Sequence, residues 1–433
     1  MKKRLFNRSF RPVALLLLIY TPFLKGQDTL FIEHSVSELY QKLTALSDTS
    51  DPADIVIYFR QPISHFNSEA GYFDQRVYLH HRGFDRPMVF NTEGYSAQKA
   101  NIESLTRRLG ANQIVAEHRY FGESIPDNSD WRYLNIRESA GDQHRIITVF
   151  RDIYRGKWIT MGISKGGQTA MYHRRFYPDD VDATVCFVAP LNFSDREPRI
   201  DTFLKEVGGR KCRDRIFEFQ QILLQRKDEL LPLFLDYARK KDYTFSIGPE
   251  TAYEYCVLEI PFAFWQWQKV TCAALPTVRT SLDTILKNFI EIASPYYFSD
   301  AGIRYYTPFF HQALNEIGYY AYDPEPFDGL IQAVSDPTFR FNAPDGTQPE
   351  FDSSVMYDIA EWLKNTGRRM IFIYGGYDPW GASAVDLGEN PYCLKMVLPG
   401  GSHATRIEDF PPDQQTYIYD TLGDWLDMQI STP

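Results

Sequence analysis

One short segment constrains the fold of this chain more than any other: Gly162-Ile163-Ser164-Lys165-Gly166-Gly167. A β-rich run, residues 157–161, leads into it, and a helix-like segment, residues 168–177, follows it. The pattern G-x-S-x-G between a strand and a helix is typical of a sharp turn that projects the serine side chain. Its glycines let neighbouring backbone approach closely. The sequence therefore predicts that Ser164 is a displayed nucleophile, with an ordinary glycine-rich turn as the alternative.

The 433 residues alternate between two styles of sequence. Residues 27–192 contain short β-rich runs that alternate with helix-like segments, which is typical of α/β architecture. In residues 193–349 apolar side chains recur at helical spacing, as in residues 213–240, where we expect a kink or a break near Pro232. Strand and helix patterns return in residues 350–433. Together with the serine turn, this order predicts an α/β-hydrolase core in two parts with an inserted helical cap.

The expected strands are residues 55–59, 75–80, 88–90, 113–116, 157–161, 183–188, 370–374 and 394–398.

A serine of ordinary pKa is a weak nucleophile, so it needs a histidine base that a carboxylate orients. In α/β-hydrolases the chain order is Ser, then Asp or Glu, then His. Three histidines follow Ser164. His173 lies in the helix directly after the turn, and His311 lies in the helical segment, whereas His403 lies in a glycine-containing loop after a strand. His403 is therefore the predicted base.

Asp378 is the predicted orienting acid. It follows a strand, residues 370–374, and precedes His403 by 25 residues. Asp386 and Glu389 are nearer to the histidine in sequence but lack this position at a strand end. A plain Asp-Pro turn is the alternative interpretation of the same residue.

The oxyanion of an acyl transfer needs two N–H donors. The backbone of Lys165, which follows the nucleophile, is the predicted first donor, and the loop that holds Gly94 is the candidate for the second.

Glu93 beside that loop is a candidate for binding a substrate ammonium group, with a solvated loop acid as the alternative. Trp380 is a further candidate for substrate binding. The aromatic segment 262–267 is expected either to wall a pocket or to pack inside the cap.

The first 26 residues carry six lysines or arginines, no acid, and one apolar run at residues 13–20. A helix that crosses a bilayer needs about 20 apolar residues, so the pattern predicts a secretory signal peptide in residues 1–26 and no stable membrane insertion. We expect export to the periplasm or beyond the cell, with an uncleaved anchor as the alternative. The net charge is −10 for the whole chain and −16 without the leader, which disfavours a role in binding nucleic acid.

The five cysteines are an odd number and have no C-x-x-C spacing, which argues against a zinc site or a redox motif. One or two disulfides fit an exported protein, and a bridge between Cys256 and Cys272 stays open. The expected chemistry requires no metal and no organic cofactor. A homodimer is conceivable, although no residue pattern indicates it.

Several segments resemble those of known serine exopeptidases. Residues 61–67 (QPISHFN) and 117–124 (EHRYFGES) are similar to segments of the family of prolyl carboxypeptidase and dipeptidyl peptidase II. Other segments resemble bacterial secreted tripeptidyl aminopeptidases; these are residues 91–95, 140–145, 376–380 and 403–407. The resemblance spans about residues 55 to 410, and its motifs occur in the order of the family.

The resemblance implies an α/β-hydrolase core with a helical cap, export, and release of short peptides from free N-termini, often with a preference for proline. It assigns the nucleophile to Ser164, the acid to Asp378 and the base to His403, and it suggests Glu93 for the substrate amine. The chain departs from its relatives at Ser64, where they often have Asp, and matches them only loosely in the cap. An esterase or lipase with the same triad is the alternative function, because fold and triad do not choose the acyl group. A third possible function is that of a non-catalytic binding protein.

Overall fold

The computed structural model describes residues 28–32, 39–41, 43–44, 53–97, 101–127 and 130–431. The predicted signal peptide, residues 1–26, lies outside these ranges. Within them, nine strands form one sheet in the order β1-β2-β3-β5-β4-β6-β7-β8-β9. None of the helices in the described ranges is both long and apolar enough to cross a bilayer.

All the predicted strands are present, and one short strand, β1, was not predicted. The strands are β1 (Asp28–Ile32), β2 (Ala53–Pro62), β3 (Tyr72–His81), β4 (Met88–Thr92), β5 (Asn112–Ala116), β6 (Trp158–Ile163), β7 (Ala183–Phe187), β8 (Met370–Gly375) and β9 (Cys393–Leu398). Among the strands of the described ranges, only β3 runs antiparallel to its neighbours, β2 and β5. The other neighbouring strands pair in parallel, so their carboxyl ends lie at one edge of the sheet.

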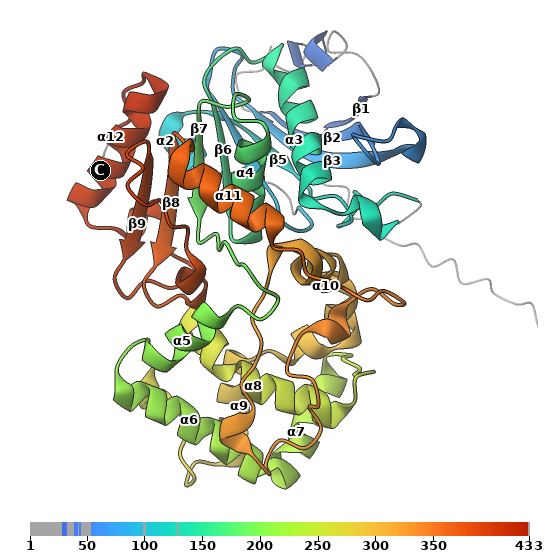
Figure 1. The fold of residues 1–433 in the computed structure, drawn as a ribbon, viewed down its shortest axis with the longest axis vertical. Coiled ribbons are helices and arrows are strands. Elements are labelled where there is room, and N and C mark those ends of the chain that lie inside the picture. Colours follow the sequence, from blue (N-terminus) through green and yellow to red (C-terminus); the bar gives the residue numbers. More distant parts are fainter. Residues whose placement is uncertain are drawn as a thin grey trace, which may run out of the picture.

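Helices cover both faces of the sheet (Figure 1). They are α2 (Ser104–Leu109), α3 (Ile136–Arg151), α4 (Lys165–Phe176), α11 (Ser354–Asn365) and α12 (Pro412–Leu426). Alternate residues of β8 show the two layers, because side chains of a strand point to opposite faces. Ile371 and Ile373 belong to the apolar cluster that contains α2 and α12, whereas Met370 and Phe372 belong to the cluster that contains α4 and α11. This mostly parallel, doubly covered sheet is the predicted α/β-hydrolase fold.

A block of helices lies between β7 and β8 in the sequence. It contains α5 (Pro198–Glu206), α6 (Arg210–Gln225), α7 (Lys227–Lys240), α8 (Pro249–Trp267), α9 (Leu282–Ile292) and α10 (Asp300–Gln312). Figure 1 shows this helical block gathered beyond the carboxyl ends of β8 and β9. It therefore faces the edge of the sheet where the serine turn lies.

Of the predicted kink or break near Pro232, the break is not observed, because the helix continues through this residue. The chain breaks at Arg226, between α6 and α7, where φ is −104° and ψ is 22°. Pro232 lies inside α7, although a proline there removes one backbone hydrogen bond. Leu230 and Phe234, two residues to either side, are fully buried in the core of the block. Tertiary packing thus keeps the helix intact across the proline.

One disulfide joins two parts of the helical block. Cys212 on α6 is bonded to Cys272 in the turn η3 (Cys272–Ala274), while Cys256 is a free, buried thiol. The bridge that the sequence left open, between Cys256 and Cys272, is therefore not formed. The observed bond ties the first half of the α8–α9 connection to the start of α6.

Replacing both Cys212 and Cys272 with alanine should lower the free energy of unfolding by about 2–4 kcal/mol, because the bond restricts an unfolded chain across a separation of 60 residues. Denaturation in guanidinium with and without reductant measures this. Reductant should lower the midpoint of the wild-type protein and leave that of the variant unchanged. Equal midpoints under oxidising conditions would contradict a stabilising bond.

Candidate active site

The serine turn joins the end of β6 to the start of α4. Ser164 has φ 55° and ψ −123°, a conformation that residues other than glycine rarely adopt. Its N–H donates to the Phe187 carbonyl at 2.8 Å, and its carbonyl accepts from the Gln168 N–H at 2.9 Å. Strained backbone of this kind persists only where the surroundings hold it, and it is concentrated at functional sites.

Two glycines make the turn possible. A Cβ atom added to Gly162 would lie closer than 3.0 Å to the backbone of Gly166. A Cβ atom added to Gly166 would lie equally close to the carbonyl oxygen of Thr92, at the end of β4. The G-x-S-x-G spacing therefore reflects close backbone contact among β6, α4 and β4.

Asp378 and His403 are in direct contact. The Nδ1 atom of His403 lies 2.7 Å from Oδ2 of Asp378, and the two side chains are 5% and 0% exposed. The other carboxylate oxygen of Asp378 accepts the backbone N–H of Trp380 at 3.2 Å, which caps the turn η8 (Pro379–Ser383). Asp378 thus orients the histidine and shapes its own turn, so the two interpretations of this residue are compatible.

The other candidate acids and bases lie elsewhere. Asp386 forms an exposed ion pair with Lys364 at 2.9 Å, and Glu389 is exposed. His173 contacts Asp180 at 2.9 Å within the core, and the ring of His311 lies against Trp131.

The helical block also contacts His403. Its backbone N–H donates to the Gln266 carbonyl at 2.9 Å, near the end of α8. The indole of Trp267 meets the imidazole edge to face, with 5.4 Å between ring centres. No local pattern around His403 predicts these contacts, because the partners are more than 130 residues away in sequence.

A cavity of about 870 Å³ lies between the strand ends and the helical block. The core contributes Glu93, Ser164, Lys165, Trp380 and His403 to its lining. The helical block and the chain that follows it contribute, among others, Glu259, Phe262, Ala263, Gln266, Trp267, Tyr320 and Tyr322. The volume is within the range of about 300–1,000 Å³ that is usual for ligand pockets. Ser164 and His403 therefore line the same cavity.

The loop after β4 is tied to the first turn of α4. Lys165 donates from Nζ to the Gly94 carbonyl at 2.8 Å, and Thr92 donates from Oγ1 to the Gly166 carbonyl at 2.7 Å. Burial lowers the pKa of Lys165 to about 7, while the carboxyl of Glu316 opposes this shift. The first N–H groups of a helix have no partner inside it, so Lys165 N–H is available at the cavity.

Glu93 lines the cavity. No described residue forms an ion pair or hydrogen bond with its carboxylate, and the side chain is half-buried. Burial, followed by the negative charges of Glu103 and Glu117, raises the pKa of Glu93 to about 7.

The aromatic segment 262–267 divides between the two expected roles. Phe262, Ala263, Gln266 and Trp267 line the cavity, whereas Phe264 and Trp265 are buried and lie outside its lining. Phe262 also meets Trp380 edge to face at 5.1 Å. Sequence reasoning missed Glu259, which lies one helical turn before Phe262 and on the same face of α8.

Residues 50–431 match the family described as PS-10 peptidase S37. The chain belongs to the peptidase S37 family. It is 33% identical over 369 residues to the prolyl tri/tetrapeptidyl aminopeptidase of Streptomyces mobaraensis, across 83% of this chain and 77% of that protein. It is 28% identical over 233 residues to the human lysosomal Pro-X carboxypeptidase, across 46% of this chain and 47% of the relative. The protein is therefore a serine-type peptidase.

Solved structures similar to this peptidase include the proline iminopeptidase of Mycobacterium smegmatis, with 13% identity and a TM-score of 0.39. That likeness covers 81% of this chain and 96% of the other. Another is VinJ, with 14% identity and a TM-score of 0.41 across 81% of this chain and 96% of the other.

Replacing Gly166 with alanine should lower the free energy of unfolding by about 1–3 kcal/mol, because its new Cβ would press on rigid backbone at Thr92. The matched control is Gly209→Ala, where no heavy atom lies within 4 Å of the added Cβ. Thermal and chemical denaturation of both variants measure the difference. Equal stability of the two variants would contradict the close contact at the turn.

Proposed function

We propose that this peptidase is an exported serine exopeptidase that releases tripeptides or dipeptides from free N-termini, with a preference for proline before the scissile bond. The 2.7 Å contact between His403 and Asp378, beside the cavity that Ser164 lines, carries this proposal. The name of the Streptomyces relative, a prolyl tri/tetrapeptidyl aminopeptidase, supports the same substrate class.

In the proposed mechanism Ser164 Oγ attacks the peptide carbonyl while Nε2 of His403 accepts its proton. Asp378 holds the Nδ1–H tautomer and stabilises the imidazolium that forms. The histidine then gives the proton to the leaving amine, so that the C–N bond breaks and an acyl-enzyme remains. Water, deprotonated by the same histidine, hydrolyses the ester and restores Ser164.

The tetrahedral oxyanion is stabilised by the N–H of Lys165 and by the loop at Gly94. The Lys165 ammonium supports this arrangement, because its hydrogen bond to the Gly94 carbonyl holds the loop beside the nucleophile. Donors fixed in advance of the reaction stabilise the developing charge without reorganisation.

Residues 193–349 act as a cap over the carboxyl ends of the strands, which favours chain ends over the middle of a polypeptide. Glu93 binds the ammonium group of the substrate, since its carboxylate lines the cavity and no described residue forms an ion pair with it. The aromatic rings of Phe262, Tyr320 and Trp380 offer an apolar wall against which a proline ring can pack.

The first test is release of a chromophore from dipeptide and tripeptide amides, with proline or alanine at the cut and a free or acetylated N-terminus. We expect cleavage of free-amine substrates that end in proline. Ser164→Ala should reduce kcat at least about 1,000-fold and leave peptide binding unchanged, because the hydroxyl forms and breaks the bonds. Ser194→Ala, outside the cavity lining, is the control. Preferred cleavage of acetylated substrates, or of esters alone, would indicate an endopeptidase or an esterase.

Glu93→Gln should raise the KM of free-amine substrates about 10- to 100-fold, because it removes one charge-assisted hydrogen bond. Acetylated product peptides should inhibit the variant and the wild-type enzyme equally.

The KM of the wild-type enzyme for free-amine substrates should depend on pH. It should fall as the pH rises through about 7, where Glu93 ionises, and it should rise again above about 8, where the α-ammonium group of the substrate loses its proton. A KM that is independent of both the mutation and the pH would remove Glu93 from the site.

A further inference from the structure

A second carboxylate lines the cavity on the side of the helical block. Glu259 lies on α8, is half-buried, and accepts hydrogen bonds from the phenol groups of Tyr320 at 2.7 Å and Tyr322 at 2.8 Å. Both phenols donate to the same oxygen, Oε2. No described residue donates to Oε1, so this oxygen keeps its full capacity to accept hydrogen bonds.

No cation in the described part of the chain neutralises Glu259. The cavity lining contains Lys165, Lys269 and Arg406, and none of them forms an ion pair with it. Lys165 is engaged by the Gly94 carbonyl, and Arg406 donates to the carbonyls of Thr405 and His403. A carboxylate that is partly removed from water without a cationic partner lowers the stability of the fold. The site therefore points to a ligand that supplies the missing positive charge.

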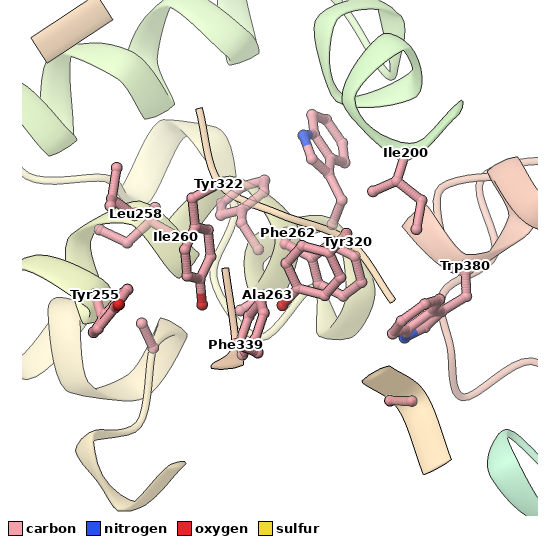
Figure 2. Packing of buried hydrophobic residues seen from close by; sticks show 14 of the residues in the cluster. Ile200, Tyr255, Leu258, Ile260, Phe262, Ala263, Tyr320, Tyr322, Phe339 and Trp380 are labelled. Carbon is pink, nitrogen blue, oxygen red and sulfur yellow. The ribbon is translucent and has the colours of Figure 1, made fainter. Parts of the chain in front are cut away.

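Aromatic contacts connect Glu259 to the reacting groups. The ring of Tyr320 stacks on Phe262 with 4.0 Å between centres, and Phe262 meets Trp380 at 5.1 Å. The N–H of Trp380 donates to Asp378. Figure 2 shows Phe262 and Tyr320 between Tyr322 and Trp380. Glu259, which is bonded to Tyr320 and Tyr322, therefore lies across an aromatic wall from the His403–Asp378 pair.

The position differs from that of Glu93. Glu93 directly follows β4 and precedes Gly94, which touches Lys165, so it lies beside the nucleophile. An extended peptide advances about 3.3 Å per residue, so each added residue moves the terminal ammonium by that distance from the scissile carbonyl. One carboxylate beside Ser164 and another beyond the aromatic wall can therefore serve ammonium groups at different distances from the cut.

We infer that Glu259, held by Tyr320 and Tyr322, forms a second anionic subsite that binds a primary ammonium group of the substrate. The inference rests on the proposed peptidase function and assigns a specificity role to a residue of the cap. Two sources can present this group: the N-terminus of an acyl segment longer than the one that Glu93 binds, or the side chain of a lysine in the released peptide. Both sources supply a positive charge for the Glu259 carboxylate and N–H donors for its Oε1 atom.

The test uses Glu259→Gln in the Ser164→Ala background, where peptide binding is measured by calorimetry without cleavage. Glutamine keeps an oxygen for Tyr320 and Tyr322 and removes only the charge. The peptides are proline-ending dipeptides, tripeptides and tetrapeptides, each free or acetylated, together with acetylated peptides that contain one lysine. The control is Glu250→Gln, which removes the same charge from an exposed position on α8 outside the cavity lining.

We expect Glu259→Gln to raise the Kd about 10- to 100-fold for peptides that carry an ammonium group at the matching position, and Glu250→Gln to leave it unchanged. Weaker binding of one length of free-amine peptide identifies the N-terminus as the source, and weaker binding of the acetylated lysine peptides identifies the side chain. Unchanged binding of every peptide would overturn the subsite. Equal weakening of acetylated, lysine-free peptides would overturn it too, since that outcome indicates a structural role.

The proposed function can fail separately. If the intact enzyme cleaves no free-amine peptide while Glu259→Gln still weakens ammonium binding in the Ser164→Ala background, the subsite stands and the exopeptidase function falls.

Discussion

The close backbone contact at the turn between β6 and α4 is the constraint on which the rest of the site depends. The backbone approaches so closely here that neither Gly162 nor Gly166 has room for a Cβ atom. The first is against the backbone of Gly166, and the second is against the Thr92 carbonyl at the end of β4. This contact holds Ser164 at positive φ and sets the loop of Gly94 beside the first turn of α4. The proposed nucleophile, Ser164, and the proposed oxyanion donors are thus held by the same backbone contact, so a change at β4 or β6 would move both.

The helical block contributes both to the position of His403 and to the lining of the cavity. His403 reaches the cavity from a loop after β9, and its backbone is held by α8 through Gln266. The same helix presents Glu259, Phe262 and Trp267 to the cavity. One helix of the block therefore holds the backbone of His403 and lines the cavity. In the proposed mechanism, the geometry of the base thus depends on the placement of this helix.

Burial shapes the electrostatics of the cavity. It raises the pKa values of Glu93 and Glu259 to about 7 and lowers that of Lys165 to about 7. Ionised acids without a counterion are costly in such surroundings, so a cationic ligand is favoured because it restores the missing interaction. The proposed preference for substrates with a free ammonium group has this burial as its physical cause.

The sequence by itself determined the strands of the core, the turn at Ser164 and the candidates Asp378 and His403, because local periodicity, glycine spacing and chain order carry that information. The tertiary structure decided the remainder. It placed the break between α6 and α7 at Arg226, while the helix continues through Pro232. It also brought the phenols of Tyr320 and Tyr322 to the carboxylate of Glu259, although they follow it by about sixty residues. Such contacts join segments that are distant in the chain, and their energies depend on burial that no local pattern encodes.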